Sequence, residues 1–245
     1  MGLGALFYPW GIVLQVIAVL HFIRRRPDTF WLWIIIIGGG LGAAVYMVAE
    51  MLPDVNLLRG VVNSMGRRKR IRDLEAVVLE NTAVGNLEEL ADLYLEERQF
   101  ARAKALYDKV IASRSDSLDA FYRRGLAELE LGEAPAALAD LDLVISQDPK
   151  YDFNRAIGLL AHACALTNHA ERAGTLFQKA VEVSTLSETY YNYATFLADQ
   201  KRTAEAREWA QRILAKKPTM PSYLRRLERP WFRKAAALIK KLPAD

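Results

Sequence analysis

Four side chains of this sequence are of the types that most often do chemistry: His21, His162, His169 and Cys164. A histidine acts as a general base, and a cysteine as a nucleophile, only with a partner group in hydrogen-bond reach. None of the four lies in a His-Glu-x-x-His, Gly-x-Ser-x-Gly or paired-cysteine motif. We expect His162 to pack as a polar residue, His169 to be solvated and Cys164 to be buried. The sequence therefore predicts a protein that is not an enzyme, with no catalytic residue, metal or cofactor.

Two apolar stretches, 3–23 and 30–49, contain no lysine, arginine or acidic residue. At 1.5 Å per residue, each forms a helix of roughly 30 Å, the thickness of a bilayer's hydrocarbon core. Aromatic rings stand near the expected membrane interfaces, at Trp10, Trp31, Trp33 and Tyr46. We predict a two-helix transmembrane hairpin in residues 1–52, in a two-pass bacterial inner-membrane protein. The alternative is a pair of buried helices in a soluble domain.

Gly38 and Gly42 lie four residues apart in the second stretch, and so on one face of the expected helix. Small residues at this spacing let another helix backbone approach closely in lipid. We favour packing against the first helix of the same chain. A homodimer contact through the two glycines is the alternative.

The hairpin resembles the N-terminal membrane hairpin of the cardiolipin synthase (phospholipase D) family. The resemblance lies in about fifty residues and rests on Arg25, Arg26, Pro27, Thr29, Trp31, Trp33, Gly42 and Tyr46, with glycine in place of the usual mid-helix proline. The catalytic half of that family, which needs a lysine two residues after a histidine, is absent. The residues two after the three histidines are Ile23, Cys164 and Glu171.

The positive charge lies at the two ends of the chain. The net charge is +3 over residues 1–83, −4 over 84–217 and +5 over 218–245. A nucleic-acid-binding protein usually has its basic stripe on the folded domain, so we expect no nucleic-acid partner. The linker 53–83 contains a basic cluster that can contact anionic lipid or act as a topology signal: Arg67, Arg68, Lys69, Arg70 and Arg72. This cluster outnumbers Arg24–Arg26, which favours the cytoplasmic side for the rest of the chain.

Residues 84–218 repeat with a period of 33 to 36 residues. Small residues recur at Ala91, Gly125, Ala161 and Ala194, and again at Ala103, Ala137, Ala173 and Ala206. Larger residues follow the second series four positions later, at Tyr107, Leu141 and Phe177, with Ala210 as the exception, and Pro149 and Pro218 close two units. This pattern resembles the tetratricopeptide repeat. It implies an all-α solenoid of about four helix pairs, each burying its apolar face by stacking on its neighbours.

The resemblance implies that the first helix of each pair lines a concave groove that binds a peptide or helix of a protein partner. The groove residues so predicted are Glu88, Asp92, Leu95, Glu96, Tyr122, Leu126, Leu129, Arg155, His162, Leu166, Tyr191, Thr195 and Asp199. Acidic and apolar residues at these positions favour a peptide with apolar anchors and some basic charge. The Lys/Asn carboxylate clamp of chaperone-binding members is replaced by Glu88 and Asp92.

The tail 219–245 is a basic amphipathic segment, for which capping of the solenoid is favoured over a helix lying on the membrane. A hairpin followed by four such repeats resembles a group of uncharacterised bacterial membrane proteins. We expect a membrane-anchored scaffold or adaptor that mediates protein–protein interaction. The alternative is an accessory or regulatory subunit of phospholipid metabolism or envelope assembly.

Overall fold

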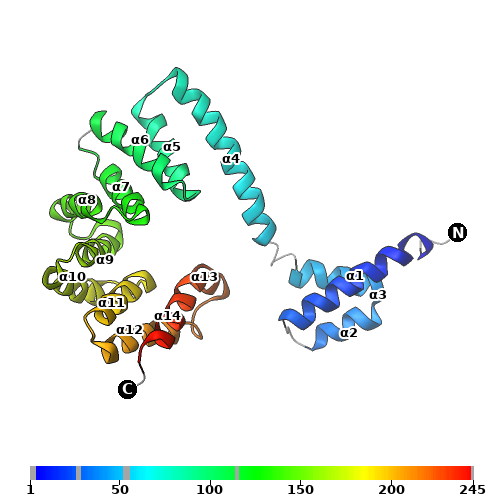
Figure 1. Ribbon diagram of the computed structural model, residues 1–245. Helices are drawn as coiled ribbons and strands as arrows, with labels where there is room; N and C mark the ends of the chain where they lie inside the picture. Colours follow the sequence, from blue (N-terminus) through cyan, green and yellow to red (C-terminus); the bar gives the residue numbers. More distant parts are fainter. Residues whose placement is uncertain (1–3, 26–28, 52–55, 114–115, 244–245) are drawn as a thin grey trace. The chain divides into compact units, whose positions relative to one another are not determined.

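The computed structural model describes residues 4–25, 29–51, 56–113 and 116–243. The chain divides into two compact units, residues 1–70 and residues 71–245, here called the N-terminal unit and the solenoid unit. All regular elements of the described residues are helices (Figure 1). Helix α4 (Asn56–Glu80) contains residues of both units.

The N-terminal unit contains α1 (Gly4–Arg25), α2 (Phe30–Ile37), α3 (Gly39–Tyr46) and a π-helical turn (Met47–Met51). The second apolar stretch is therefore not the single long helix that its composition predicts. Helix α2 ends where Gly39 takes φ +57°, a left-handed conformation that glycine adopts without steric cost. Within the described ranges, none of the helices combines the length and apolar composition that a membrane span requires. The predicted two-helix spanning hairpin is thus not found.

The glycines of this unit allow close approach within the chain. A Cβ atom added at Gly42 would lie 1.9 Å from the Ile34 carbonyl oxygen, and one added at Gly38 would lie 2.6 Å from it. Gly38 and Gly42 remain neighbours, since the Gly42 N–H donates to the Gly38 carbonyl at 2.9 Å, but the helix is interrupted at Gly38 and the nearest atoms to an added Cβ belong to Ile34 or Gly42 and not to α1. A different glycine contacts the first helix: a Cβ at Gly40 in α3 would lie 3.0 Å from the Cα of Gly11 in α1.

The solenoid unit is built from four consecutive helix pairs (Figure 1). The pairs are α5 (Val84–Glu96) with α6 (Phe100–Ser113), α7 (Leu118–Leu131) with α8 (Ala134–Gln147), α9 (Tyr151–Leu166) with α10 (Ala170–Val183), and α11 (Ser187–Asp199) with α12 (Thr203–Ala215). Figure 1 shows the pairs following one another around a curve. The pairing confirms the predicted repeat and its period.

The repeated small residues are buried where helices cross. Seven alanines of the two predicted series are fully buried: Ala91, Ala161, Ala194, Ala103, Ala137, Ala173 and Ala206. At the remaining position, a Cβ added to Gly125 would lie 3.2 Å from Leu141 of the paired helix. Small side chains are needed here because a larger one would hold the two helix axes apart.

The turn inside each pair also repeats. One residue of each turn has positive φ, and these residues are Arg98, Gly132, Asn168 and Lys201. In each turn, the next backbone N–H bonds back to a carbonyl of the first helix, as from Gln99 to Tyr94 and from Glu133 to Glu128. This geometry is the Schellman ending of a helix, which glycine favours. Only the second unit has glycine there.

The second half of α4 belongs to the solenoid core. Ile71 and Leu74 are buried against Leu87 and Leu90 of α5, and Tyr94 donates a hydrogen bond to Glu75. The predicted linker 53–83 therefore contains a long helix whose last turns cover the first repeat. Of the predicted lipid-contacting residues on α4, Arg68, Lys69, Arg70 and Arg72 are exposed and Arg67 is half-buried.

The last helices, α13 (Ser222–Leu227) and α14 (Arg229–Lys241), form the C-terminal cap. Pro230 stands in the first turn of α14, where its missing N–H costs nothing. Phe232 and Ala235 are buried against Ala194 of α11 and Ala210 of α12. The apolar face of this amphipathic helix is thus used in packing on the fourth repeat.

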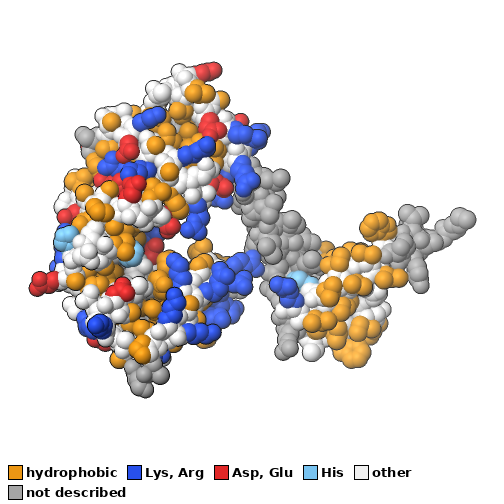
Figure 2. Space-filling view, in the orientation of Figure 1, with side chains coloured by type: hydrophobic (Ala, Val, Ile, Leu, Met, Phe, Trp, Pro, Cys, Tyr) orange, Lys and Arg blue, Asp and Glu red, His pale blue; other side chains and the backbone are white. Residues whose placement is uncertain are grey.

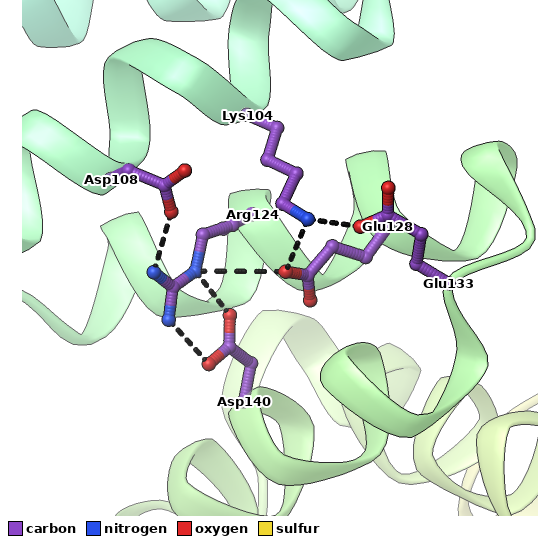
Figure 3. Close-up of polar contacts among 6 residues, drawn as sticks. All are labelled: Lys104, Asp108, Arg124, Glu128, Glu133 and Asp140. Atoms are coloured by element: carbon purple, nitrogen blue, oxygen red, sulfur yellow. Dashed lines mark hydrogen bonds and ion pairs between the residues drawn. The ribbon is translucent and has the colours of Figure 1, made fainter.

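An ionic network joins α6, α7 and α8 around the buried carboxylates of Glu128 and Asp140, while Asp108 and Glu133 at its edges are about half exposed (Figure 3). Arg124 donates from Nε and Nη2 to the two carboxylate oxygens of Asp140, at 2.7 and 2.8 Å, and from Nη1 to Asp108 at 2.8 Å. Lys104 pairs with Glu133 and with Glu128, whose carboxylate lies 3.6 Å from the Lys104 Nζ. Burial, with the Asp140 charge next, raises the pKa of Glu128 to about 7. This network lies between the first two repeats.

Candidate functional site

The first helices of all four repeats line one cavity of the solenoid unit, of about 340 Å³. We call it the concave cavity, and its lining residues are Leu95, Glu96, Phe100, Leu126, Leu129, Glu130, Arg155, Leu159, His162, Glu188, Asn192, Trp231 and Lys234. The first nine residues come from the first three repeats, and the last two from α14 of the cap. A concave surface with an apolar floor and a few polar groups is typical of a binding site.

Apolar side chains from three successive first helices form the floor. Leu95 comes from α5, Leu126 and Leu129 from α7, and Leu159 from α9, with Phe100 beside them. Leu95 and Leu129 are one period of 34 residues apart and so occupy equivalent places on stacked helices. The floor can receive an apolar side chain of a partner.

The middle of the cavity is polar and internally neutralised. Arg155 Nε donates to the Glu188 carboxylate at 2.7 Å, and Arg155 Nη1 lies 3.5 Å from the Tyr122 hydroxyl oxygen. Tyr122 in turn donates to Asp152. The pair between Arg155 and Glu188 crosses from α9 to α11, so it holds the two first helices in register as well as lining the cavity.

His162 lines the same cavity and, within the described part of the chain, takes part in no ion pair. Burial is the main cause that lowers the pKa of its imidazole below the usual 6.5, and Lys234 lowers it further. The ring is therefore neutral at pH 7, with one nitrogen to donate and one to accept a hydrogen bond. It suits a peptide amide or a side-chain hydroxyl.

Six of the predicted groove residues line the concave cavity: Leu95, Glu96, Leu126, Leu129, Arg155 and His162. Other predicted residues have different roles. Tyr122 is buried with its ring 5.0 Å from that of Tyr151, and Asp92 accepts a hydrogen bond from Tyr107 at 2.6 Å. Thr195 bonds to the Tyr191 carbonyl of its own helix at 3.0 Å. The remaining ones, Glu88, Leu166 and Asp199, lie on the first helices but outside the cavity lining.

The cap covers the fourth-repeat end of the predicted groove. The Trp231 ring lies 5.8 Å from that of Tyr191, and Lys234 Nζ lies 5.5 Å from the same ring. Trp231 and Lys234 have no counterpart in the repeats, so sequence periodicity carried no signal for them. Periodicity did carry a signal for two other missed residues, because Glu130 is one period after Glu96 and Asn192 is one period after Leu159.

The cysteine and the third histidine are placed as the sequence predicts. Cys164 is fully buried, and burial raises the pKa of its thiol. His169 is exposed, with its Nδ1 2.9 Å from the Thr167 hydroxyl oxygen. Among the described residues, no group of three or more His, Cys, Asp or Glu side chains is arranged to hold a metal ion.

Residues 88–152 and 167–221 match the family model of the tetratricopeptide repeat. Among curated proteins, none matches the chain. The matched ranges begin after the N-terminal unit, so the resemblance of that unit to the cardiolipin synthase hairpin stays a prediction.

Solved structures share the fold. MamA (residues 41 to the end) from Desulfovibrio magneticus RS-1 superposes with a TM-score of 0.57 at 20% identity, over 68% of this chain and 94% of that one. A tetratricopeptide repeat protein from Parabacteroides merdae ATCC 43184 gives 0.55 at 18% identity, over 82% and 84%. YrrB, described as a TPR protein with an unusual peptide-binding site, gives 0.52 at 15% identity, over 65% and 82%. Residues 88–152 and 167–221 thus carry tetratricopeptide repeats, in an all-α solenoid.

Proposed function

We propose that this protein is a non-catalytic scaffold that binds a peptide or helix of a partner protein in the concave cavity. The observation that carries the proposal is the apolar floor of Leu126, Leu129 and Leu159, flanked by charged and neutral hydrogen-bonding groups. A floor of this kind gives affinity through buried apolar area, and its rim gives specificity. The peptide-binding site named for YrrB supports the proposal by analogy of fold.

The chemistry of the solenoid unit supports a binding role over a catalytic one. The Cys164 thiol is buried and its pKa is raised, so it is a poor nucleophile at pH 7. In the cavity, the Arg155 guanidinium is paired with Glu188, and the His162 imidazole has no nucleophile beside it among the lining residues. An enzyme would require a nucleophile or an acid–base pair at hydrogen-bond distance.

Replacing Leu129 with aspartate should weaken peptide binding without unfolding the protein. The carboxylate would lie in the apolar floor, where an apolar side chain of the peptide would have to remove water from its charge. We expect peptides selected by display against the full chain to bind Leu129→Asp at least about tenfold more weakly. The matched control is Leu131→Asp, two residues away on α7, where the side chain is 38% exposed and outside the cavity lining. Equal binding by both variants would place the site elsewhere, and the absence of any selected peptide would contradict the scaffold role.

The N-terminal unit supports a second part of the proposal, attachment to a membrane. Two polar side chains of its first three helices are bonded inside the unit: Gln15 donates to the Ile35 carbonyl at 2.9 Å, and His21 lies 2.9 Å from the buried Tyr46 hydroxyl. Its large apolar side chains point outward, including Trp10, Trp33, Ile36, Ile37, Leu41 and Val48, all more than half exposed. Figure 2 shows this apolar surface in orange. Such a distribution is the reverse of a water-exposed surface and suits lipid.

We expect the full chain to float with phospholipid vesicles in a density gradient. Aspartate at Trp33, Ile37 and Leu41 together should lower the floating fraction at least about tenfold, because each charge costs about 2 to 3 kcal/mol in hydrocarbon. The matched control introduces three aspartates at exposed apolar positions of the solenoid unit, Leu131, Val183 and Leu186. Flotation that the first variant retains would contradict lipid contact by this surface.

We place the solenoid unit on the cytoplasmic side of a bacterial inner membrane, where the exposed basic side chains of α4 meet anionic lipid. A C-terminal fusion to paired reporters, one active only inside the cytoplasm and one only outside it, tests this localisation.

An accessory role in phospholipid metabolism makes a different prediction from a simple membrane anchor. It requires the native N-terminal unit, whereas a simple attachment is replaceable by an unrelated membrane hairpin.

A further inference from the structure

The two walls of the concave cavity carry opposite charge. Helix α5, at one wall, contains four acidic residues and no lysine or arginine: Glu88, Glu89, Asp92 and Glu96. The C-terminal cap, at the other wall, carries seven basic residues, all exposed, against the single acid Glu228: Arg225, Arg226, Arg229, Arg233, Lys234, Lys240 and Lys241. Figure 2 shows the Lys and Arg side chains gathered over this part of the solenoid unit.

Both walls reach the same cavity. Glu96 lines it from α5 and Glu130 from α7, whereas Lys234 and Trp231 line it from α14. Lys234 is held in place, because its Nζ lies 4.3 Å from the centre of the Trp231 ring. Between the walls, the pair of Arg155 with Glu188 adds no net charge, and the floor is apolar. A ligand that crosses the cavity therefore meets negative, apolar and positive surface in order.

We propose that the concave cavity selects a dipolar peptide, in which basic residues at one end and acidic residues at the other flank an apolar side chain. The proposal rests on the proposed function and adds the charge pattern of the partner. The basic residues lie against α5, the apolar side chain on the leucine floor, and the acidic residues against the cap. Complementary charge at both walls steers the encounter and gives orientation.

The acidic wall distinguishes this partner from a polyanion. The seven basic residues of the cap alone would attract nucleic acid or an acidic surface of any kind. A uniform polyanion that enters the cavity, however, meets Glu96, which repels it, while Glu130 is paired with Arg98 at 3.3 Å. A uniform polycation meets Lys234 and its neighbours with the same result. Only a ligand with both signs satisfies both walls.

The test uses the full chain and three synthetic peptides of equal length with one central leucine. The first has a lysine pair on one side and an aspartate pair on the other, the second has lysine pairs on both sides, and the third has aspartate pairs on both sides. At low salt, we expect the dipolar peptide to bind about threefold to tenfold more tightly than either uniform peptide, and about 0.5 M NaCl to remove most of the difference.

Reversing one charge at each wall shows which end of the dipolar peptide lies against which wall. Lys234→Glu should weaken the dipolar and all-acidic peptides and strengthen the all-basic one, each by about threefold to tenfold. Glu96→Lys should weaken the dipolar and all-basic peptides and strengthen the all-acidic one. Lys179→Glu and Glu182→Lys are the matched controls, because both residues are exposed on α10 and neither lines the cavity.

Two results would overturn the proposal while leaving the proposed function intact. One is tightest binding of a uniform peptide, and the other is binding of all three peptides that neither reversal changes. If the wild-type chain bound none of the three peptides, that result would instead contradict the proposed function. A matching melting temperature for each variant shows that a change in affinity is not a change in folding.

Discussion

Replacing Phe177 with alanine should cost about 4 kcal/mol of unfolding free energy, because it empties a fully buried site between two repeats. Phe177 is fully buried, and its ring lies 5.2 Å from that of Tyr193 and 5.5 Å from that of Phe196. The substitution removes the ring that joins the third repeat to the fourth and leaves a cavity. Because the helix pairs stack in a line, no distant part of the core can fill that space.

The measurement is urea unfolding followed by circular dichroism, with hydrogen exchange to locate the loss. Amides of α9 to α12 should exchange faster in Phe177→Ala, whereas those of α5 and α6 should change little, because each repeat contacts mainly its neighbours. Phe153→Ala is the matched control, since that side chain is 91% exposed and its removal should change stability by less than about 0.5 kcal/mol. A uniform rise in exchange over all four repeats would show that the solenoid unfolds as one block.

The period of the small residues was enough to predict the four helix pairs. Ala103, Ala137 and Ala173 recur because two helices can cross closely only over a small side chain, and this constraint is visible in the residue type itself. The same period placed Leu95, Leu126 and Leu129 on one surface. The register of the repeats was therefore enough to predict both the fold and the leucines at the centre of the candidate site.

Other features left a weaker trace in the sequence. The turn residues Arg98 and Lys201 adopt positive φ with side chains that do not favour it, so only Gly132 and Asn168 gave a local signal. The cap's position over Tyr191 depends on tertiary packing of Trp231 and has no periodic signal at all. In the N-terminal unit, the uncharged apolar stretch 30–49 predicted one long helix and missed the interruption at Gly39, because an apolar composition says nothing about backbone conformation.

Replacing Arg124 with methionine should destabilise the protein by about 3 to 5 kcal/mol at pH 8. Arg124 holds Asp140 through two charge-assisted hydrogen bonds of 2.7 and 2.8 Å, and the Asp140 side chain is 8% exposed (Figure 3). Methionine keeps the length of the apolar stem but removes the charge. Asp140 would then be buried without its main partner, beside the equally buried Glu128, and two carboxylates in a dry site repel each other.

The loss should be smaller at pH 5 than at pH 8, by at least about 1 kcal/mol. The pKa of Glu128 is raised to about 7, above the 4.5 that the unfolded chain shows, so protonation of Glu128 favours the folded state. This contribution is complete below pH 4.5 and is lost as the pH rises through about 7. The Arg124 charge lowers that pKa. Without it, the folded state with Glu128 ionised at pH 8 is higher in free energy.

Urea unfolding of the wild type and of Arg124→Met at both pH values measures this difference. Adding Asp140→Asn to Arg124→Met should restore part of the stability at pH 8, because it removes the buried charge that lost its partner. Glu128→Gln in the same background should remove most of the pH dependence. An equal loss at pH 5 and pH 8 would mean that the titration of Glu128 plays no part in the effect of Arg124 on stability. Recovery by the added Asp140→Asn would then assign the whole loss to the Asp140 carboxylate, whose two hydrogen bonds from Arg124 are gone.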